Sequence, residues 1–188
     1  MSRLEDPELT KPSDRKLIEA VFAGKNAAYE KLYDRYAPLV RAICYDTTLN
    51  LTDAQDLAQD VFMRAYEKLG YLRDPERFGN WLVGITRLRC REWRRQRLRN
   101  QDRNIGLNKA RSVVTDPLDD SRIELLRKMI TILPEKERLA LHIFYLQGNS
   151  AENARGIMGL SRSGFYRVLD RARKRLEQLL VQEQEDIQ

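Results

Sequence analysis

Apolar residues recur at intervals of three and four positions along almost the whole chain, which is the spacing of one face of an α-helix. Alternation of β-branched and polar residues, the mark of a half-buried strand, is rare. The pattern therefore predicts an all-α protein. Four helices are expected in the first half, over about residues 14–23, 27–46, 53–69 and from 77 onward.

The boundaries of these helices carry local signals. Thr52 or Asp53 is a suitable N-cap for the third helix, and Gly70 stands where a helix commonly stops. Pro38 lies inside the second helix, where a proline can introduce a kink because it cannot donate a backbone hydrogen bond.

Four more helices are predicted in the second half, over residues 122–133, 134–147, 150–158 and 161–178. Pro134 suits the first turn of a helix, while Ser150 and Ser161 are favourable N-caps. Gly159 and Leu160 separate the last two helices. A helix, a glycine-containing turn and a basic helix together predict a helix-turn-helix unit.

Residues 100–120, NQDRNIGLNKARSVVTDPLDD, are polar and show no helical pattern. They are predicted to form a flexible linker between two small helical domains, and a surface loop within one domain is the alternative. The predicted organisation is a tail at 1–13, a first domain at 14–99, the linker, a helix-turn-helix domain of winged-helix-like or four-helix form at 121–182, and a tail at 183–188.

Composition narrows the class of protein. The chain of 188 residues carries a net charge of +6, contains no run of 18 apolar residues, and begins with a polar segment unlike a signal peptide. A cytoplasmic protein without membrane insertion is predicted. His142 is the only histidine, and Cys44 and Cys90 are expected to be free thiols. These residues do not make a zinc-binding set, so neither metal nor cofactor is expected.

A strongly basic segment, RLRCREWRRQRLR at residues 87–99, contains seven arginines and one glutamate. If this segment is helical, arginines lie on one face and apolar residues on the opposite face. The arginines of the basic face are Arg87, Arg91, Arg94 and Arg95. Guanidinium groups match phosphate geometry, so a nucleic-acid-binding face is favoured over a merely solvated one. Trp93 either stacks on an unpaired base or packs in the core.

The last predicted helix has a second basic face, because residues 162–175 contain six basic residues and one acid. Its apolar stripe is Phe165, Val168, Leu169, Ala172 and Leu176. A packed back and a polar front are what a DNA recognition helix needs. Asp170 is expected to pair with Arg167 or Lys174, although it could accept a hydrogen bond from cytosine.

An acidic face runs along residues 53–69, where Asp53, Asp56, Asp60 and Glu67 project within a narrow arc. Taken alone, the pattern favours a solubilising surface with a helix-dipole benefit near the N-terminus. The alternative is a docking site for a basic protein surface.

Four segments in this order resemble the extracytoplasmic-function (ECF) group of bacterial sigma-70 factors, which are two-domain helical proteins. They are AYEKLYDRYAPLV (28–40), DAQDLAQDVFMRAYEKL (53–69), RFGNWLVGITRLRCREWRRQR (77–97) and LPEKERLALHIFYLQGNSAENARGIMGLSRSGFYRVLDRARKRLEQLL (133–180). The resemblance implies a non-catalytic sigma factor that binds core RNA polymerase, recognises promoter DNA as duplex and as melted strand, and starts transcription. An anti-sigma factor is a common further partner in this family.

The resemblance also implies roles for individual residues and reverses the interpretation of the acidic face. The family's Asp-Leu-x-Gln-Asp/Glu motif falls on Asp56, Gln59 and Asp60, so a polymerase-binding role is expected for Asp53, Asp56, Gln59, Asp60 and Met63. Contacts with the minus-ten element are expected from Phe78, Asn80, Arg87, Arg91, Trp93, Arg94 and Arg95. Contacts with the minus-thirty-five element are expected from Ser161, Arg162, Ser163, Tyr166, Arg167, Arg171 and Lys174.

The sequence departs from the family at the recognition helix. Family members often begin this helix with Ser-x-Gly-Thr-Val, whereas this chain has Ser161-Arg-Ser-Gly-Phe165, with the glycine one place later. Asn153 stands where the family often has Glu. These differences keep the expected fold but leave the minus-thirty-five sequence unassigned.

Two rival functions have different signatures. A free-standing helix-turn-helix regulator would share the recognition helix but would lack the polymerase-binding face, and a repressor would normally need a dimer seam. A small nuclease would need a metal cluster, a phosphate-cradling glycine loop or a nucleophile with its base, and the sequence offers none of these.

Overall fold

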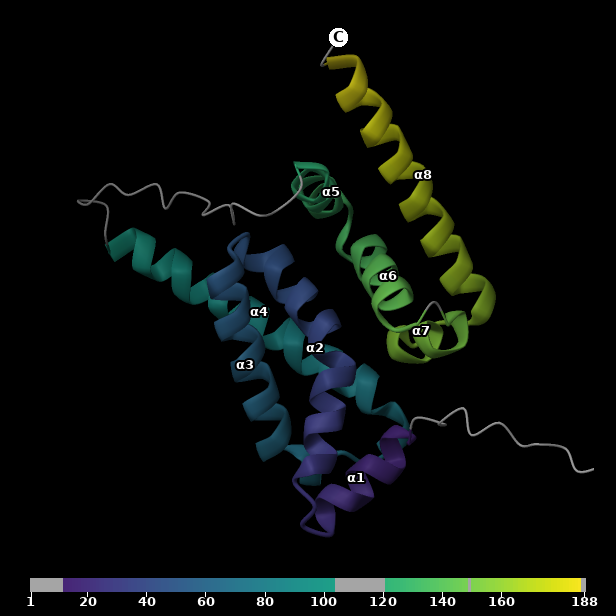
Figure 1. Ribbon diagram of the computed structural model, residues 1–188. Coiled ribbons are helices and arrows are strands. Elements are labelled where there is room, and N and C mark those ends of the chain that lie inside the picture. The colour runs from purple at the N-terminus through teal and green to yellow at the C-terminus, as the bar shows by residue number, and fades with distance from the viewer. Residues whose placement is uncertain (1–11, 104–120, 149, 187–188) are drawn as a thin grey trace, which may run out of the picture.

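The computed structural model describes residues 12–103, 121–148 and 150–186 (Figure 1). Within these ranges it contains eight α-helices and two short 3-10 turns, and no strand. The prediction of an all-α protein is confirmed. The predicted two-domain division with a linker stays a prediction, because residues 104–120 lie outside the described residues.

The first four helices are α1 (Asp14–Phe22), α2 (Ala27–Thr48), α3 (Leu51–Glu67) and α4 (Phe78–Arg103). The 3-10 turns Leu69–Tyr71 and Pro75–Arg77 connect α3 to α4. Helix α2 continues through Pro38, which lies on its exposed side. Helix α4 extends to Arg103, so the first four residues of the predicted linker are helical.

The turn between α2 and α3 differs from the prediction. Asn50 is the N-cap of α3, and its side-chain oxygen accepts a hydrogen bond from the backbone N–H of Asp53 at 2.9 Å. Leu51 and Thr52 are therefore already helical. Leu49 adopts φ of 52°, the left-handed conformation that reverses the chain before this cap.

The C-terminal helices are α5 (Ser121–Ile132), α6 (Glu135–Leu146), α7 (Ala151–Met158) and α8 (Arg162–Asp186). Ser150 caps α7 as predicted, and its hydroxyl accepts from the N–H of Asn153 at 3.2 Å. The hydroxyl of Ser161 likewise accepts from the N–H of Gly164 at 3.1 Å. Between them, Gly159 has φ of 65° and ends α7.

Two boundaries in this half are corrected. Pro134 is the residue that precedes α6, with extended ψ, rather than a member of its first turn. Helix α8 continues to Asp186, well beyond residue 178, so most of the predicted C-terminal tail is helical. The C-terminal region is a set of four helices, and no wing strand lies in the described residues.

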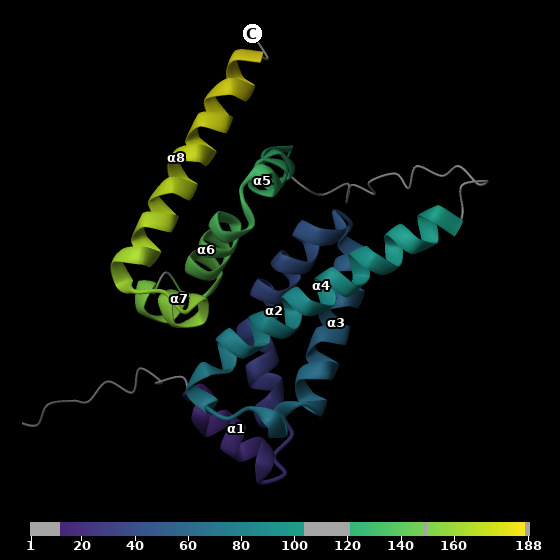
Figure 2. The same cartoon turned by 180° about the vertical axis from the view of Figure 1, so that it is seen from behind.

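Helix α2 is the centre of the packing. It contacts α1, α3 and α4 in its own half, and it also contacts α6 of the C-terminal half, while α7 lies against α4. Both views of the ribbon show the green C-terminal helices beside the face formed by α2 and α4 (Figures 1 and 2). One cluster of buried apolar side chains extends through both halves.

Candidate functional site

Helix α3 presents three exposed side chains on one face, Asp56, Gln59 and Met63, and the side chain of Met63 is 58% exposed. The opposite face of α3, including Val61 and Ala65, is buried against α2 and α4. The three exposed side chains have no intramolecular ion pair in the part of the chain that the structure describes, so they are free to bind a partner.

The other two predicted polymerase-binding residues have partners inside the molecule. The carboxylate of Asp60 accepts a hydrogen bond from Nε of Arg89 on α4 at 2.5 Å, and Asp53 pairs with Arg97 at 3.5 Å. Arg89 also pairs with Glu92. Partial burial opposes the charge of Arg89, but the hydrogen bonds and negative charges of Asp60 and Glu92 raise the pKa of its guanidinium. These pairs fasten α3 to α4.

The basic face of α4 is present as predicted. Arg91, Arg94 and Arg95 are exposed, and no described acid pairs with any of them. Arg87 is also exposed, but its Nε donates to Glu135 of α6 at 2.8 Å. The face therefore offers three unpaired guanidinium groups and one that is engaged with the C-terminal half.

Phe78 is a core residue of this structure, and its predicted contact with DNA stays a prediction. Its side chain is 0% exposed and packs against Tyr36 and Trp81, with ring centroids 5.4 Å and 5.9 Å apart. A ring enclosed in this way cannot reach a base without unfolding the start of α4.

Asn80 and Trp93 also make contacts inside the molecule. The side-chain amide of Asn80 donates to the backbone carbonyl of Ile157 in α7 at 2.7 Å. Trp93 is partly buried against the core, and the guanidinium of Arg97 lies 5.0 Å from its ring centroid. Of the two roles left open for Trp93, packing is the one seen here.

The front of α8 is exposed to solvent. Ser161, Arg162, Ser163, Tyr166, Arg167, Arg171 and Lys174 are all exposed. The back is the buried stripe of Phe165, Val168, Leu169 and Ala172. Asp170 pairs with Lys174 at 3.1 Å, which confirms one of the two surface pairings expected for it.

Sequence reasoning missed a charged cluster between the two halves. Nε of Arg138 and Nε2 of His142, both on α6, each lie 3.0 Å from Oδ2 of Asp46 on α2. The one sequence signal for this cluster is the position of His142 between the apolar residues Leu141 and Ile143, both of which are buried. Periodicity could not reveal which partner lies opposite.

Cys44 and Cys90 are free, as predicted, and both are buried. Hydrogen bonding with Cys44, together with the Thr47 hydroxyl and the charge of Arg94, lowers the pKa of Cys90 against the opposing effect of burial. The same hydrogen bond and burial raise the pKa of Cys44.

The described residues hold no group of three or more His, Cys, Asp or Glu side chains arranged to bind a metal ion. Within the same ranges, none of the helices combines the length and apolar character needed to cross a bilayer.

Comparisons with known proteins identify the family. Residues 32–100 match the family model for sigma-70 region 2. The chain is 27% identical over 168 residues to the probable RNA polymerase sigma factor RfaY of Xanthomonas campestris pv. campestris, covering 85% of this chain and 42% of that protein. It is 30% identical over 154 residues to the ECF RNA polymerase sigma factor SigM of Bacillus subtilis, covering 80% of this chain and 93% of the relative.

The fold has solved counterparts as well. The structure of CnrH in complex with the cytosolic domain of CnrY superposes with a TM-score of 0.62 at 25% identity, over 90% of this chain and 97% of that one. Sequence and structure thus agree over both halves of the molecule, and the chain belongs to the family of ECF RNA polymerase sigma factors.

Proposed function

We propose that the chain is a dissociable initiation subunit that binds core RNA polymerase, directs it to promoters and opens the DNA strands. The observation that carries the proposal is the exposed face of Asp56, Gln59 and Met63 on α3, set beside the basic face of α4. Family membership favours this role over a free-standing regulator, which would need no such face.

The α3 face is proposed to dock on a basic surface of core polymerase. The carboxylate of Asp56 is solvated in the free chain, so electrostatic complementarity would steer the encounter. The flexible side chain of Met63 supplies apolar contact area. Asp53 and Asp60 are proposed to act indirectly, because their ion pairs with α4 fix the orientation of the docking helix.

The basic face of α4 is proposed to hold the promoter where it melts. Arg91, Arg94 and Arg95 would contact phosphates, and their binding energy would offset unstacking, which costs a few kcal/mol for each base. Because Phe78 is buried in this structure, Asn80 and the loop before α4 are the proposed base-contacting part.

The front of α8 is proposed to read duplex DNA in the major groove at the minus-thirty-five element. Arg167, Arg171 and Lys174 would contact phosphates and base edges, and Tyr166 offers both a ring and a hydroxyl. The protein would catalyse no reaction of its own and would act in the bacterial cytoplasm. An anti-sigma factor as a partner stays a prediction.

The test is to mix the purified chain with bacterial core RNA polymerase and measure co-elution, followed by permanganate reactivity of unpaired thymines on promoter DNA selected from genomic fragments. The proposal expects a stable complex and strand opening only when both proteins are present. A chain that bound duplex DNA but ignored core polymerase would contradict it and restore the free-standing regulator.

A prediction concerns the α8 face alone. Arg167→Ala combined with Arg171→Ala is expected to weaken binding to a duplex fragment carrying the selected promoter by about tenfold or more, since one arginine contact with a base is worth about 1–3 kcal/mol. If both residues contact phosphates instead, the slope of log affinity against log salt falls by about 0.9 for each. Fluorescence anisotropy of the holoenzyme at stepped salt concentrations measures both quantities.

The matched control for this pair is Arg173→Ala. Arg173 is on the same helix and carries the same charge, but its guanidinium lies 5.3 Å and 5.7 Å from the ring centroids of Phe144 and Tyr145. It should lose little DNA affinity. Equal losses in the control and in the double variant would show only a general charge effect and would remove the assignment of the α8 face.

A further inference from the structure

Cys44 of α2 and Cys90 of α4 lie together in the core between these two helices, which pack against each other (Figures 1 and 2). Their side chains are 0% and 2% exposed, and the two thiols share a hydrogen bond. The thiol of Cys90 also donates to the backbone carbonyl of Ile43 at 3.9 Å, next to the peptide bond that leads into Cys44. Only a small approach therefore separates the two sulfurs from the length of a disulfide bond, about 2.0 Å.

A small molecule can reach Cys90 through a cavity of about 110 Å³, which this residue lines together with Thr47 of α2 and Arg94 of α4. The exposed side chains of Arg94 and Glu135 form part of the lining, so the cavity is open to solvent. One water molecule occupies about 30 Å³ of the liquid, so the cavity has room for a molecule of hydrogen peroxide. Of the two cysteines, Cys90 is the one that lines this cavity.

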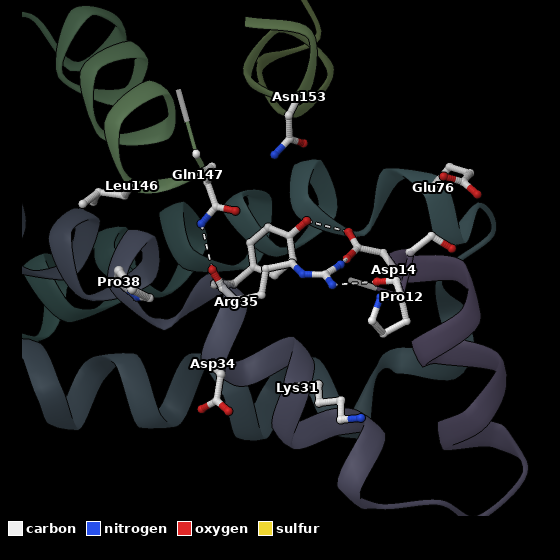
Figure 3. A pocket seen from close by; sticks show the side chains of 13 residues that line it. Pro12, Asp14, Lys31, Asp34, Arg35, Pro38, Glu76, Leu146, Gln147 and Asn153 are labelled. Carbon is white, nitrogen blue, oxygen red and sulfur yellow. Dashed lines mark hydrogen bonds and ion pairs between the residues drawn. The ribbon is translucent and has the colours of Figure 1, made fainter. Parts of the chain in front are cut away.

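The larger cavity of the molecule, about 830 Å³, gives no access to the thiols. Figure 3 shows it bordered by Arg35 and Gln147, and neither cysteine is among the residues that line it. An oxidant that enters from solvent therefore meets the thiol of Cys90 first, through the smaller cavity.

The groups around the two thiols support the same order of reaction. The hydrogen bond from Cys44, the hydroxyl of Thr47 and the charge of Arg94 lower the pKa of Cys90, and burial opposes them. The same hydrogen bond and burial raise the pKa of Cys44. Since the thiolate is the form that attacks an oxidant, Cys90 is suited to attack and Cys44 to resolve the product.

We propose that Cys44 and Cys90 form an oxidation site for peroxides, at which a reversible disulfide ties α2 to α4. Such a site would exist whether or not the chain serves polymerase, because it involves only the chain's own helices. The disulfide closes a loop between residues 44 and 90 and restricts the unfolded chain, so it stabilises the folded N-terminal half.

The reaction has two steps. The sulfur of Cys90 attacks one oxygen of hydrogen peroxide, the O–O bond breaks, and the departing hydroxide takes the thiol proton and becomes water, which leaves a sulfenic acid. The sulfur of Cys44 then attacks the sulfur of Cys90, so the S–S bond forms, the S–O bond breaks, and hydroxide leaves with the proton of Cys44 as a second water. Two electrons pass from the sulfurs to the peroxide. A dithiol such as dithiothreitol reverses the change by thiol–disulfide exchange.

The first experiment uses the reduced full chain, treated with a small molar excess of hydrogen peroxide and quenched with catalase. Intact-mass spectrometry should show the loss of two hydrogen atoms, and a digest made without reductant should contain the peptides of Cys44 and Cys90 joined to each other. Dithiothreitol should restore both thiols. A digest in which both thiols stay free, or in which the links join two separate chains, would overturn the proposal.

Two matched variants test the order of attack, since Cys44→Ala and Cys90→Ala each keep one thiol. With peroxide and the sulfenic-acid trap dimedone, Cys44→Ala should be labelled on Cys90 about fivefold or more faster than Cys90→Ala is labelled on Cys44. Equal labelling would remove Cys90 as the attacking thiol. Far-ultraviolet circular dichroism checks both variants, and if either loses helicity the digest of the parent chain decides the question.

Thermal unfolding tests the link between the two helices. The oxidised parent chain should unfold at a midpoint higher than that of the reduced chain by about 5 °C or more, and the gain should vanish with dithiothreitol. Cys90→Ala given the same peroxide treatment should show no such gain. A midpoint that is unchanged or lower in the oxidised parent chain would mean that the sulfurs join only by distorting the core, and would refute a stabilising disulfide.

Discussion

Replacing Asp56, Gln59 and Met63 together with alanine is expected to lower the affinity of the chain for core RNA polymerase by about 100-fold, or about 2.7 kcal/mol. The three side chains are exposed and make no intramolecular ion pair within the described residues, so their loss should be felt in binding and not in folding. A few residues usually dominate a protein interface, with truncations that cost about 2 kcal/mol or more.

The measurement is a titration of labelled core polymerase with each variant, alongside a thermal unfolding curve. Asp34→Ala is the control, since it removes an exposed carboxylate from α2 and leaves α3 untouched. Wild-type affinity in the triple variant, with an unchanged unfolding midpoint, would show that α3 is not the docking helix and would return its acids to a solubilising role.

Asp60 is left out of that variant for a structural reason. Its carboxylate accepts from Arg89 at 2.5 Å, in a pair whose side chains are 37% and 25% exposed. Removing it would leave Arg89 with Glu92 alone and loosen α3 on α4. A loss of polymerase binding on that change would then mix a contact effect with an orientation effect, whereas the exposed trio separates them.

The helices could be predicted from the sequence because their signals are local. Apolar residues at helical spacing marked each element, and Ser150 and Ser161 marked the starts of α7 and α8 by a hydroxyl that accepts a backbone N–H three residues on. The exposed front and buried back of α8 followed from the same periodicity. All of these depend on neighbours within a few residues.

The ends of the polar helices were harder to predict. Helices α4 and α8 run to Arg103 and Asp186 through segments with few apolar residues, where no glycine or proline gives a stop signal. Such segments are compatible with helix or coil on propensity alone, because straight-chain polar residues cost little in a helix.

Contacts between distant segments could not be predicted at all. Asn80 was correctly placed at the start of a helix, but its partner, the carbonyl of Ile157, is 77 residues away. The same holds for Asp46 and His142, which are 96 residues apart in sequence. A single sequence reports the face on which a side chain lies, and only the packed structure reports what that face meets.

Phe78 illustrates this difference and leads to the second large effect. Phe78→Ala is expected to lower the free energy of unfolding by about 3–5 kcal/mol, the usual cost of removing a buried phenylalanine ring and leaving a cavity. The ring is 0% exposed and makes an edge contact with Tyr36, whose hydroxyl donates to Asp14 at 2.5 Å, so the cavity would open beside the anchor of α1. Urea denaturation followed by circular dichroism measures the loss.

Phe78→Leu is the matched control, because it keeps an apolar side chain in place and should retain most of the stability, losing about 1.5 kcal/mol or less. The pair separates the two roles that have been considered for this residue. A core residue gives a large loss of stability for alanine and a small one for leucine. A base-stacking residue would instead leave the unfolding curve unchanged and weaken single-strand binding equally in both variants, because leucine has no ring to stack on a base. That second outcome would return Phe78 to the DNA-contacting set and would require the start of α4 to open when promoter DNA binds.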